Sequence, residues 1–94
     1  MWCISEERTA EKQLDKAPKE ILRAYEFWKN IVSVDGPEGL RRFSGFRDHP
    51  LIGLWSGAHS SYLNNKWRVI YWVQHVELQV LVLEVNAHDY RKKS

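Results

Sequence analysis

The chain has 94 residues, of which 44% are hydrophobic and 13% aromatic. This is enough apolar material for the core of one domain, spanning residues 1–94, and too little for a second. With one cysteine, Cys3, the chain can form neither an internal disulfide nor a four-thiolate zinc site. No run approaches the roughly 20 apolar residues that span a bilayer, and no signal-peptide core develops near the start. We therefore expect a cytoplasmic protein that does not associate with membranes.

The net charge of +2 is unevenly distributed along the chain. Residues 1–40 carry six Lys or Arg against eight Asp or Glu, whereas residues 41–94 carry eight against four. A basic second part favours an anionic partner such as nucleic acid. Surplus cations on a solvated face are also common, so charge alone does not decide between these interpretations.

Helical spacing of apolar residues before Gly36 predicts two packed helices. The first stripe consists of Ala10, Leu14 and Ala17, and the second of Ile21, Leu22, Tyr25, Trp28, Ile31 and Val32. Pro18 opens the second helix in a favoured first-turn position. The segment VDGPEG then ends the pattern, because Gly and Pro disfavour helix continuation. One further helical turn is expected around residues 40–43.

After Pro50 the sequence becomes rich in β-branched and aromatic residues, which favours strands. Three consecutive antiparallel strands are predicted in LIGLWSGAHSSYL, KWRVIYWVQ and LQVLVLEVNAHDY, joined by turns at LNNKW and QHVEL. A short strand at WCIS near the start adds a fourth. The sequence therefore predicts an α+β fold.

Polar residues gather where the last predicted strand ends. By strand alternation Val80, Val82, Glu84, Asn86, His88 and Tyr90 share one face. Arg68 begins the preceding strand, so antiparallel pairing brings it beside His88. The sequence does not fix the register, and so does not decide whether the two share a face.

Arg68, His88 and Tyr90 together form a minimal site for cleaving RNA without a metal. Histidine transfers protons near neutral pH, arginine stabilises charge on phosphate, and tyrosine stacks on bases. In the alternative interpretation His88 only caps the strand end, Arg68 forms an ion pair and Tyr90 covers the core.

The order of the elements and the segments EKQLDKAPKEI, HPLIGLWSGAHSSYL, WRVIYWV and VNAHDY resemble the RelE/ParE superfamily of toxins from bacterial type II toxin-antitoxin systems. Because it has a histidine at the end of the last strand, the chain is more similar to the RNA-cleaving RelE, YoeB, YafQ and HigB branches than to the gyrase-poisoning ParE branch. The resemblance implies two N-terminal helices packed on one face of a small antiparallel sheet of three to four strands. It also implies mRNA bound on the opposite face at the ribosome, and neither a metal nor another cofactor.

By this resemblance the catalytic roles fall on Arg68, His88 and Tyr90. Ser61 and Tyr62 stand where YoeB-like members carry arginines, and the lysines used in RelE are absent. His59 is therefore expected as a second titrating group, with His49 a weaker candidate, and His75 is excluded because it lies in the QHVEL turn. The residues expected to contact RNA are Arg47, Ser60, Lys66, Arg91 and Lys92.

The predicted partners are an antitoxin encoded by an adjacent gene, mRNA with the ribosome, and promoter DNA bound only by the toxin-antitoxin complex. Two other functions stay open at this point. One is a ParE-like inhibitor of DNA gyrase, and the other is a non-catalytic binding module with the same fold. The gyrase inhibitor would need none of His59, His88 or Arg68, and the binding module would be harmless when expressed without a partner.

Overall fold

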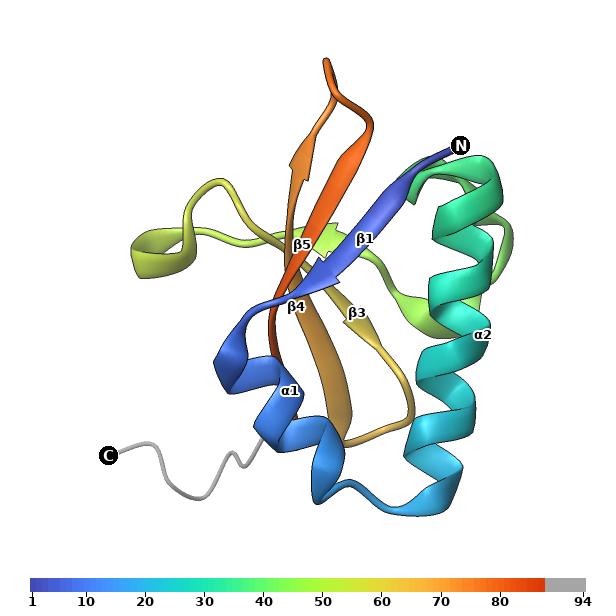
Figure 1. The fold of residues 1–94 in the computed structure, drawn as a ribbon, viewed down its shortest axis with the longest axis vertical. Helices are drawn as coiled ribbons and strands as arrows, with labels where there is room; N and C mark the ends of the chain where they lie inside the picture. The colour runs from blue at the N-terminus through green and yellow to red at the C-terminus, as the bar shows by residue number, and fades with distance from the viewer. Residues whose placement is uncertain (88–94) are drawn as a thin grey trace.

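The computed structural model describes residues 1–87, and the predictions for His88, Tyr90, Arg91 and Lys92 lie outside the described residues. The elements are β1 (Cys3–Glu6), α1 (Arg8–Asp15), α2 (Lys19–Asp35), three short 3-10 helices, η1 (Pro37–Arg42), η2 (Ser44–Phe46) and η3 (Gly53–Trp55), and the strands β2 (His49–Pro50), β3 (His59–Tyr62), β4 (Trp67–Gln74) and β5 (Gln79–Ala87). The predicted α+β class is confirmed (Figure 1). Neither α-helix in the described part has the length and apolar character that crossing a bilayer requires.

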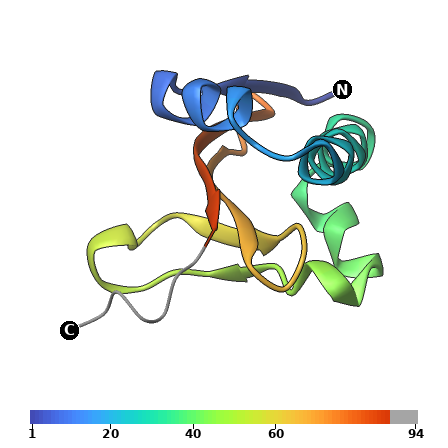
Figure 2. The same ribbon diagram turned by 90° about the horizontal axis from the view of Figure 1, so that it is seen from below.

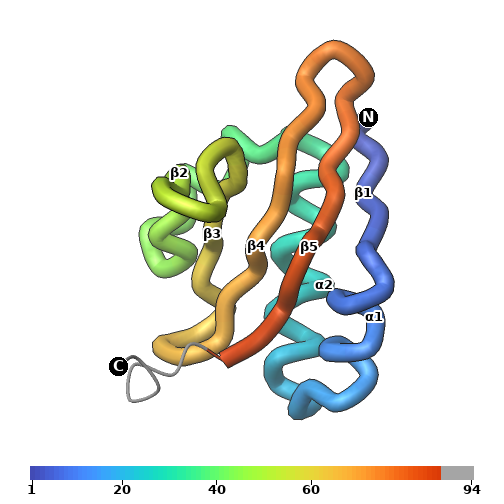
Figure 3. The backbone as a smooth tube through the Cα atoms, turned by 90° about the vertical axis from the view of Figure 1, so that its left-hand side faces the viewer, coloured from blue at the N-terminus to red at the C-terminus, as the bar shows by residue number. Residues whose placement is uncertain are grey.

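The five strands form one mixed sheet in the order β1-β5-β4-β3-β2 (Figure 3). Strands β2 to β5 pair antiparallel with their neighbours, as predicted for the last three. Two details of the prediction were wrong. The sheet has five strands rather than three or four, and β1 runs parallel to β5, with Ile4 opposite Val80. Strand β1 is joined to β5 through both helices and the rest of the sheet, so no hairpin forces an antiparallel arrangement.

Both helices pack on the same face of the sheet, as expected (Figure 2). Helix α2 buries Tyr25 and Trp28 against this face, and the Trp28 ring lies 5.3 Å from the Tyr71 ring between centroids. Helix α2 begins directly after Pro18, which is its N-cap rather than part of its first turn, and ends at Asp35 with Gly36 as its C-cap. Gly36 has a φ of 78°, and a Cβ there would lie 2.6 Å from Nε1 of Trp2, so only glycine fits this position.

The predicted strand over residues 51–63 is much shorter than expected. Only β3 is extended, because residues 51–58 form a loop with η3, in which Gly53 and Gly57 have φ values of 75° and 97°. Left-handed glycines of this kind interrupt a strand. The predicted LNNKW turn is present, and the side-chain oxygen of Asn64 accepts hydrogen bonds from the backbone N–H groups of Lys66 and Trp67.

Because of a β-bulge in β5, the residues that were predicted to share one face, Val80, Val82, Glu84 and Asn86, lie on two faces. Tyr71 pairs with Val82 but Ile70 pairs with Glu84, so Leu83 is an extra residue in β5. Val80, Val82 and Val85 are buried beneath the helices, whereas Glu84 and Asn86 lie on the other face. The bulge is held from α1, because the side chain of Gln13 accepts a hydrogen bond of 2.7 Å from the backbone N–H of Val85.

Alkaline pH should destabilise the fold through two buried tyrosines. Burial, together with a hydrogen bond to Glu6, raises the pKa of Tyr25, and burial and the charge of Asp48 raise that of Tyr71. The unfolded chain therefore ionises first, at about pH 10, and the free energy of unfolding falls above that pH. Denaturant titrations at a series of pH values should show this fall, with a smaller slope in the Tyr25→Phe and Tyr71→Phe variants. A slope that is the same in all three proteins would contradict the assignment.

Candidate functional site

The sheet face opposite α1 and α2, here called the open face, carries a row of polar side chains. Antiparallel register places Tyr62 of β3 opposite Arg68 of β4, and Arg68 opposite Asn86 of β5. Directly opposed residues project from the same face, so these three side chains lie side by side. The register also confirms that the start of β4 lies beside the end of β5.

The Arg68 guanidinium is incompletely satisfied. Its Nε is buried and has no hydrogen-bond partner among the described residues. The hydroxyl of Ser60, a fully buried residue, is in the same condition on the same face. Buried donors without partners are costly. Arg68 as a whole is half-buried, so the residue is open to a ligand on this face. A phosphate suits this position, because guanidinium donates to two of its oxygens at once.

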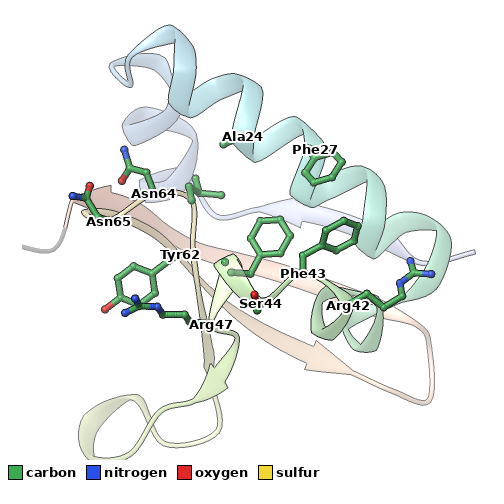
Figure 4. Close-up of a pocket in the computed structure, with 12 residues that line it drawn as sticks. Ala24, Phe27, Arg42, Phe43, Ser44, Arg47, Tyr62, Asn64 and Asn65 are labelled. Carbon is green, nitrogen blue, oxygen red and sulfur yellow. The ribbon is translucent and has the colours of Figure 1, made fainter.

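Arg47 and His49 approach the row from the segment that leads into β2. The Arg47 guanidinium lies over the Tyr62 ring at 5.9 Å, and the His49 ring stacks on Tyr62 with 6.4 Å between centroids. Figure 4 shows Arg47 and Tyr62 side by side. His49 also pairs with Ser60 across β2 and β3. Two cations, a phenol and an imidazole therefore gather at this end of the open face.

The local backbone fixes the tautomer of His49. Its Nδ1 lies 2.6 Å from the backbone carbonyl oxygen of Arg47, and a carbonyl only accepts, so Nδ1 carries the proton. In the neutral ring Nε2 is then free to accept a proton. Arg47 itself is held in the left-handed conformation, with a φ of 48°. Such a conformation costs free energy in a non-glycine residue, so neighbouring contacts must maintain it.

Asp48 supplies those contacts from the other side of the segment. One of its carboxylate oxygens accepts hydrogen bonds from the Ser61 hydroxyl at 2.6 Å and the Tyr71 hydroxyl at 2.5 Å. Ser61 and Tyr71 are fully buried and belong to the central strands β3 and β4. Asp48 therefore anchors the backbone on either side of it, which carries Arg47 and His49.

Loss of this anchor should be measurable as lost stability. Replacing Asp48 by Ala leaves two buried hydroxyls without an acceptor, at about 1–3 kcal/mol for each in the free energy of unfolding. Asp48→Asn keeps one acceptor oxygen and should lose less. Asp15→Ala, at the exposed end of α1, is the matched control and should change stability little. Urea denaturation of the four proteins checks the order, and an Asp48→Ala variant as stable as the control would contradict the anchoring role.

The structure does not bring His59 together with Arg68. In β3, His59 shares a face with Ser61 and projects toward the helices, where its ring stacks on Tyr71 at 5.5 Å. Tyr62 and Ser60 point to the opposite side. His75 lies in the turn between β4 and β5, beside Trp2, at the far end of β4 from Arg68, as expected.

Of the predicted site residues, the structure places Arg68, Ser60 and Arg47 around the open face. Lys66 lies in the turn directly before β4 and is exposed. Sequence reasoning ranked His49 below His59 and did not name Tyr62, Asn86 or Asp48 for the site. A signal for His49 was present in RDHP, where a cation lies two residues before a histidine that starts a short edge strand.

These features define an α+β protein in which helices cover one face of a five-stranded mixed sheet and cationic side chains gather on the other. No protein-family model matches the chain, and neither does any curated protein sequence. Solved structures do share its fold. YafQ from E. coli strain BL21(DE3) matches with a TM-score of 0.75 and 16% identity over 93% of each chain.

A chain of the archaeal RelE-RelB complex from Pyrococcus horikoshii matches with a TM-score of 0.71 and 21% identity, over 99% of this chain and 98% of that one. A chain of the YoeB-YefM complex from Staphylococcus aureus matches with a TM-score of 0.73 and 14% identity, over 95% and 99%. The chain therefore has the fold of the RelE, YafQ and YoeB toxins.

Proposed function

We propose that this chain is the toxin of a type II toxin-antitoxin system and acts as a metal-independent endoribonuclease that cleaves mRNA at the ribosome. The observation that carries the proposal is the half-buried Arg68 in the polar row of the open face, opposite Tyr62 and Asn86. An RNA phosphate beside Arg68 would have its charge neutralised. The fold shared with RelE, YafQ and YoeB supports the same conclusion.

The chemistry requires three groups. In the proposed reaction Nε2 of His49 accepts the proton of the ribose 2′-hydroxyl, and the 2′-oxygen attacks phosphorus. Arg68 stabilises the additional negative charge of the phosphorane. The bond from phosphorus to the 5′-oxygen then breaks, and a second group protonates the leaving oxygen. The products are a 2′,3′-cyclic phosphate and a 5′-hydroxyl.

For the second proton transfer we propose His88, with Tyr90 as a stacking residue, on the strength of the sequence alone. The pairing of Arg68 with Asn86 places β5 beside the guanidinium two residues before His88. The RNA strand would also meet Arg47, Ser60 and Lys66, and further along the chain Arg91 and Lys92. All of these groups act without a metal or other cofactor in the proposed mechanism.

The proposed partners follow from the same family of folds. Related structures are complexes named RelE-RelB, YoeB-YefM and DinJ-YafQ, the last described as a toxin-antitoxin complex. We infer that an adjacent gene encodes a cognate antitoxin. This antitoxin would cover the open face and would bind promoter DNA only in complex with this chain. The place of action would then be the bacterial cytoplasm.

Expression of this chain alone tests the proposal. Growth should stop, and primer extension should reveal shortened mRNA within minutes, whereas co-expression of the product of the adjacent gene should restore growth. Cleavage by the purified protein, with ribosomes present, should persist after treatment of the protein with EDTA. Broken DNA with intact mRNA would indicate a ParE-like gyrase inhibitor instead, and unaffected growth would indicate a non-catalytic binding module.

A further inference from the structure

A second feature adjoins the open face. A surface pocket of about 810 Å³ lies between α2, the η1–η2 segment and the turn between β3 and β4 (Figure 4). Three aromatic rings form its apolar side, with 5.4 Å between the centroids of Phe27 and Phe43 and 5.9 Å between those of Phe43 and Phe46. We call this the aromatic pocket.

The aromatic pocket leaves large apolar surfaces in water. Phe46 is buried, but Phe27 is 52% exposed and Phe43 is 38% exposed. Phe27 projects from the side of α2 that faces η1 and η2 rather than into the core (Figure 4). Exposed rings grouped in a concave surface are typical of binding sites rather than of solvated surface, because burying them against a ligand is favourable.

The aromatic pocket is continuous with the open face. Arg47 and Tyr62 line the pocket, and both also belong to the site described above, where Arg47 lies over the Tyr62 ring. An RNA strand whose phosphate is held near Arg47 and Arg68 would therefore have the base next to that phosphate at the mouth of this pocket.

The charge of the lining also favours an anionic chain. Two arginines, Arg42 and Arg47, line the aromatic pocket, and no carboxylate does. Arg42 forms an ion pair with Asp35, whereas Arg47 forms no ion pair with a carboxylate among residues 1–87. By contrast, a pocket of about 480 Å³ between α1 and α2 is lined by four acidic side chains, Glu6, Glu11, Asp15 and Glu26.

We propose that the aromatic pocket holds an unstacked nucleobase of the RNA strand bound on the open face, beside the scissile phosphate. This inference rests on the proposed function and adds a base subsite to it. Stacking on Phe43 and Phe27 supplies the affinity, as aromatic platforms do for single-stranded nucleic acids. The polar side chains of Ser44 and Asn65 at the edge of the pocket are in place to contact the edge of the base.

The test combines a scan of the RNA with a change in the pocket. A short RNA made non-cleavable by 2′-O-methyl groups is prepared with a single abasic residue at each position in turn. Binding is measured by fluorescence anisotropy at low salt, to the wild type and to Phe43→Ala. One abasic position should weaken binding to the wild type about tenfold to a hundredfold, the usual effect of one stacked base. The same abasic residue should cost Phe43→Ala little more, because the pocket contact is already lost.

Two control variants keep the test clear. Phe43→Trp preserves the stacking surface and should retain the abasic effect, which separates loss of stacking from misfolding. Val34→Ala removes an apolar side chain of α2 that is 64% exposed and does not line the pocket, and should bind as the wild type does. Thermal unfolding of each variant verifies that it is folded.

The outcomes for the pocket and for the proposed function are distinguishable. If the protein cleaves unmodified RNA but no abasic position weakens binding, the base subsite is overturned and the nuclease stands. The same holds if the loss of affinity from the abasic residue simply adds to the loss from Phe43→Ala. A pocket-dependent abasic effect without any cleavage would support the subsite and contradict the nuclease. A wild type that binds none of the oligonucleotides, or a Phe43→Ala variant that keeps RNA affinity but loses a protein partner, would also overturn the subsite.

Discussion

Replacing Arg68 by Ala is expected to slow RNA cleavage about 10²–10³-fold, the usual cost of removing one group that stabilises charge in the transition state. The physical reason is that Arg68 is the cation in the middle of the polar row between Tyr62 and Asn86. Its loss leaves the phosphorane charge without a bidentate partner. The rate constant for cleavage under single-turnover conditions measures the effect directly, because product release does not contribute to it.

The Arg68 variants should remain folded, because the buried Nε has no partner to lose among the described residues. Arg68→Lys keeps the charge but loses the fork of donors, and should recover only part of the rate. Arg23→Ala removes an exposed cation of α2 on the covered side of the sheet and is the matched control. If the folded Arg68→Ala protein cleaves RNA as fast as Arg23→Ala, Arg68 has no part in the reaction.

Substitution of the two proposed proton-transfer histidines should have effects of similar size. His49→Ala and His88→Ala are each expected to reduce the rate about 10²–10⁴-fold. Each substitution should also remove one limb of the bell-shaped dependence of rate on pH. Loss of the general base, His49, should remove the rise, and loss of the general acid, His88, should remove the fall. The double variant should be little slower than the worse single variant if both histidines act in one step, because such groups are not additive.

His59→Ala provides the internal comparison for these histidines. Its ring stacks on Tyr71 beneath the helices, so this substitution should lower thermal stability while the cleavage rate per folded molecule stays within about twofold of the wild type. Stability and rate are measured on the same preparation. A large loss of rate in His59→Ala with no change in His49→Ala would restore the original ranking from the sequence.

Local patterns in the sequence were sufficient for the helices and the hairpins. Apolar spacing located α1 and α2, and Asn64 with its neighbours located the turn before β4, since these features depend on residues close together in the chain. The parallel pairing of β1 with β5 was not predictable in this way. It depends on Ile4 meeting Val80, 76 positions further along the chain, after the helices have packed.

The candidate site was harder to predict for two reasons. His59 and His49 are both histidines in strand-like surroundings, and only the pairing of His49 with Ser60 shows which of them faces Arg68. The choice therefore required the register of the sheet. The open face also depends on Asp48, whose hydrogen bonds to Ser61 and Tyr71 join segments that a sequence pattern treats separately.

The extra residue Leu83 has a consequence for comparing this chain with distant relatives. It shifts the phase of alternation along β5, so the even-numbered Val80 and Val82 before it lie beneath the helices, whereas the even-numbered Glu84 and Asn86 after it lie on the open face. An alignment that keeps hydrophobic positions in step without a gap at residue 83 would assign Asn86 to the core and displace everything beyond it by one position. Deleting Leu83 would remove the bulge and restore regular alternation, which leaves Glu84 and Asn86 on the open face. The bulge at Leu83 thus sets the register in which Asn86, rather than Val85, stands opposite Arg68.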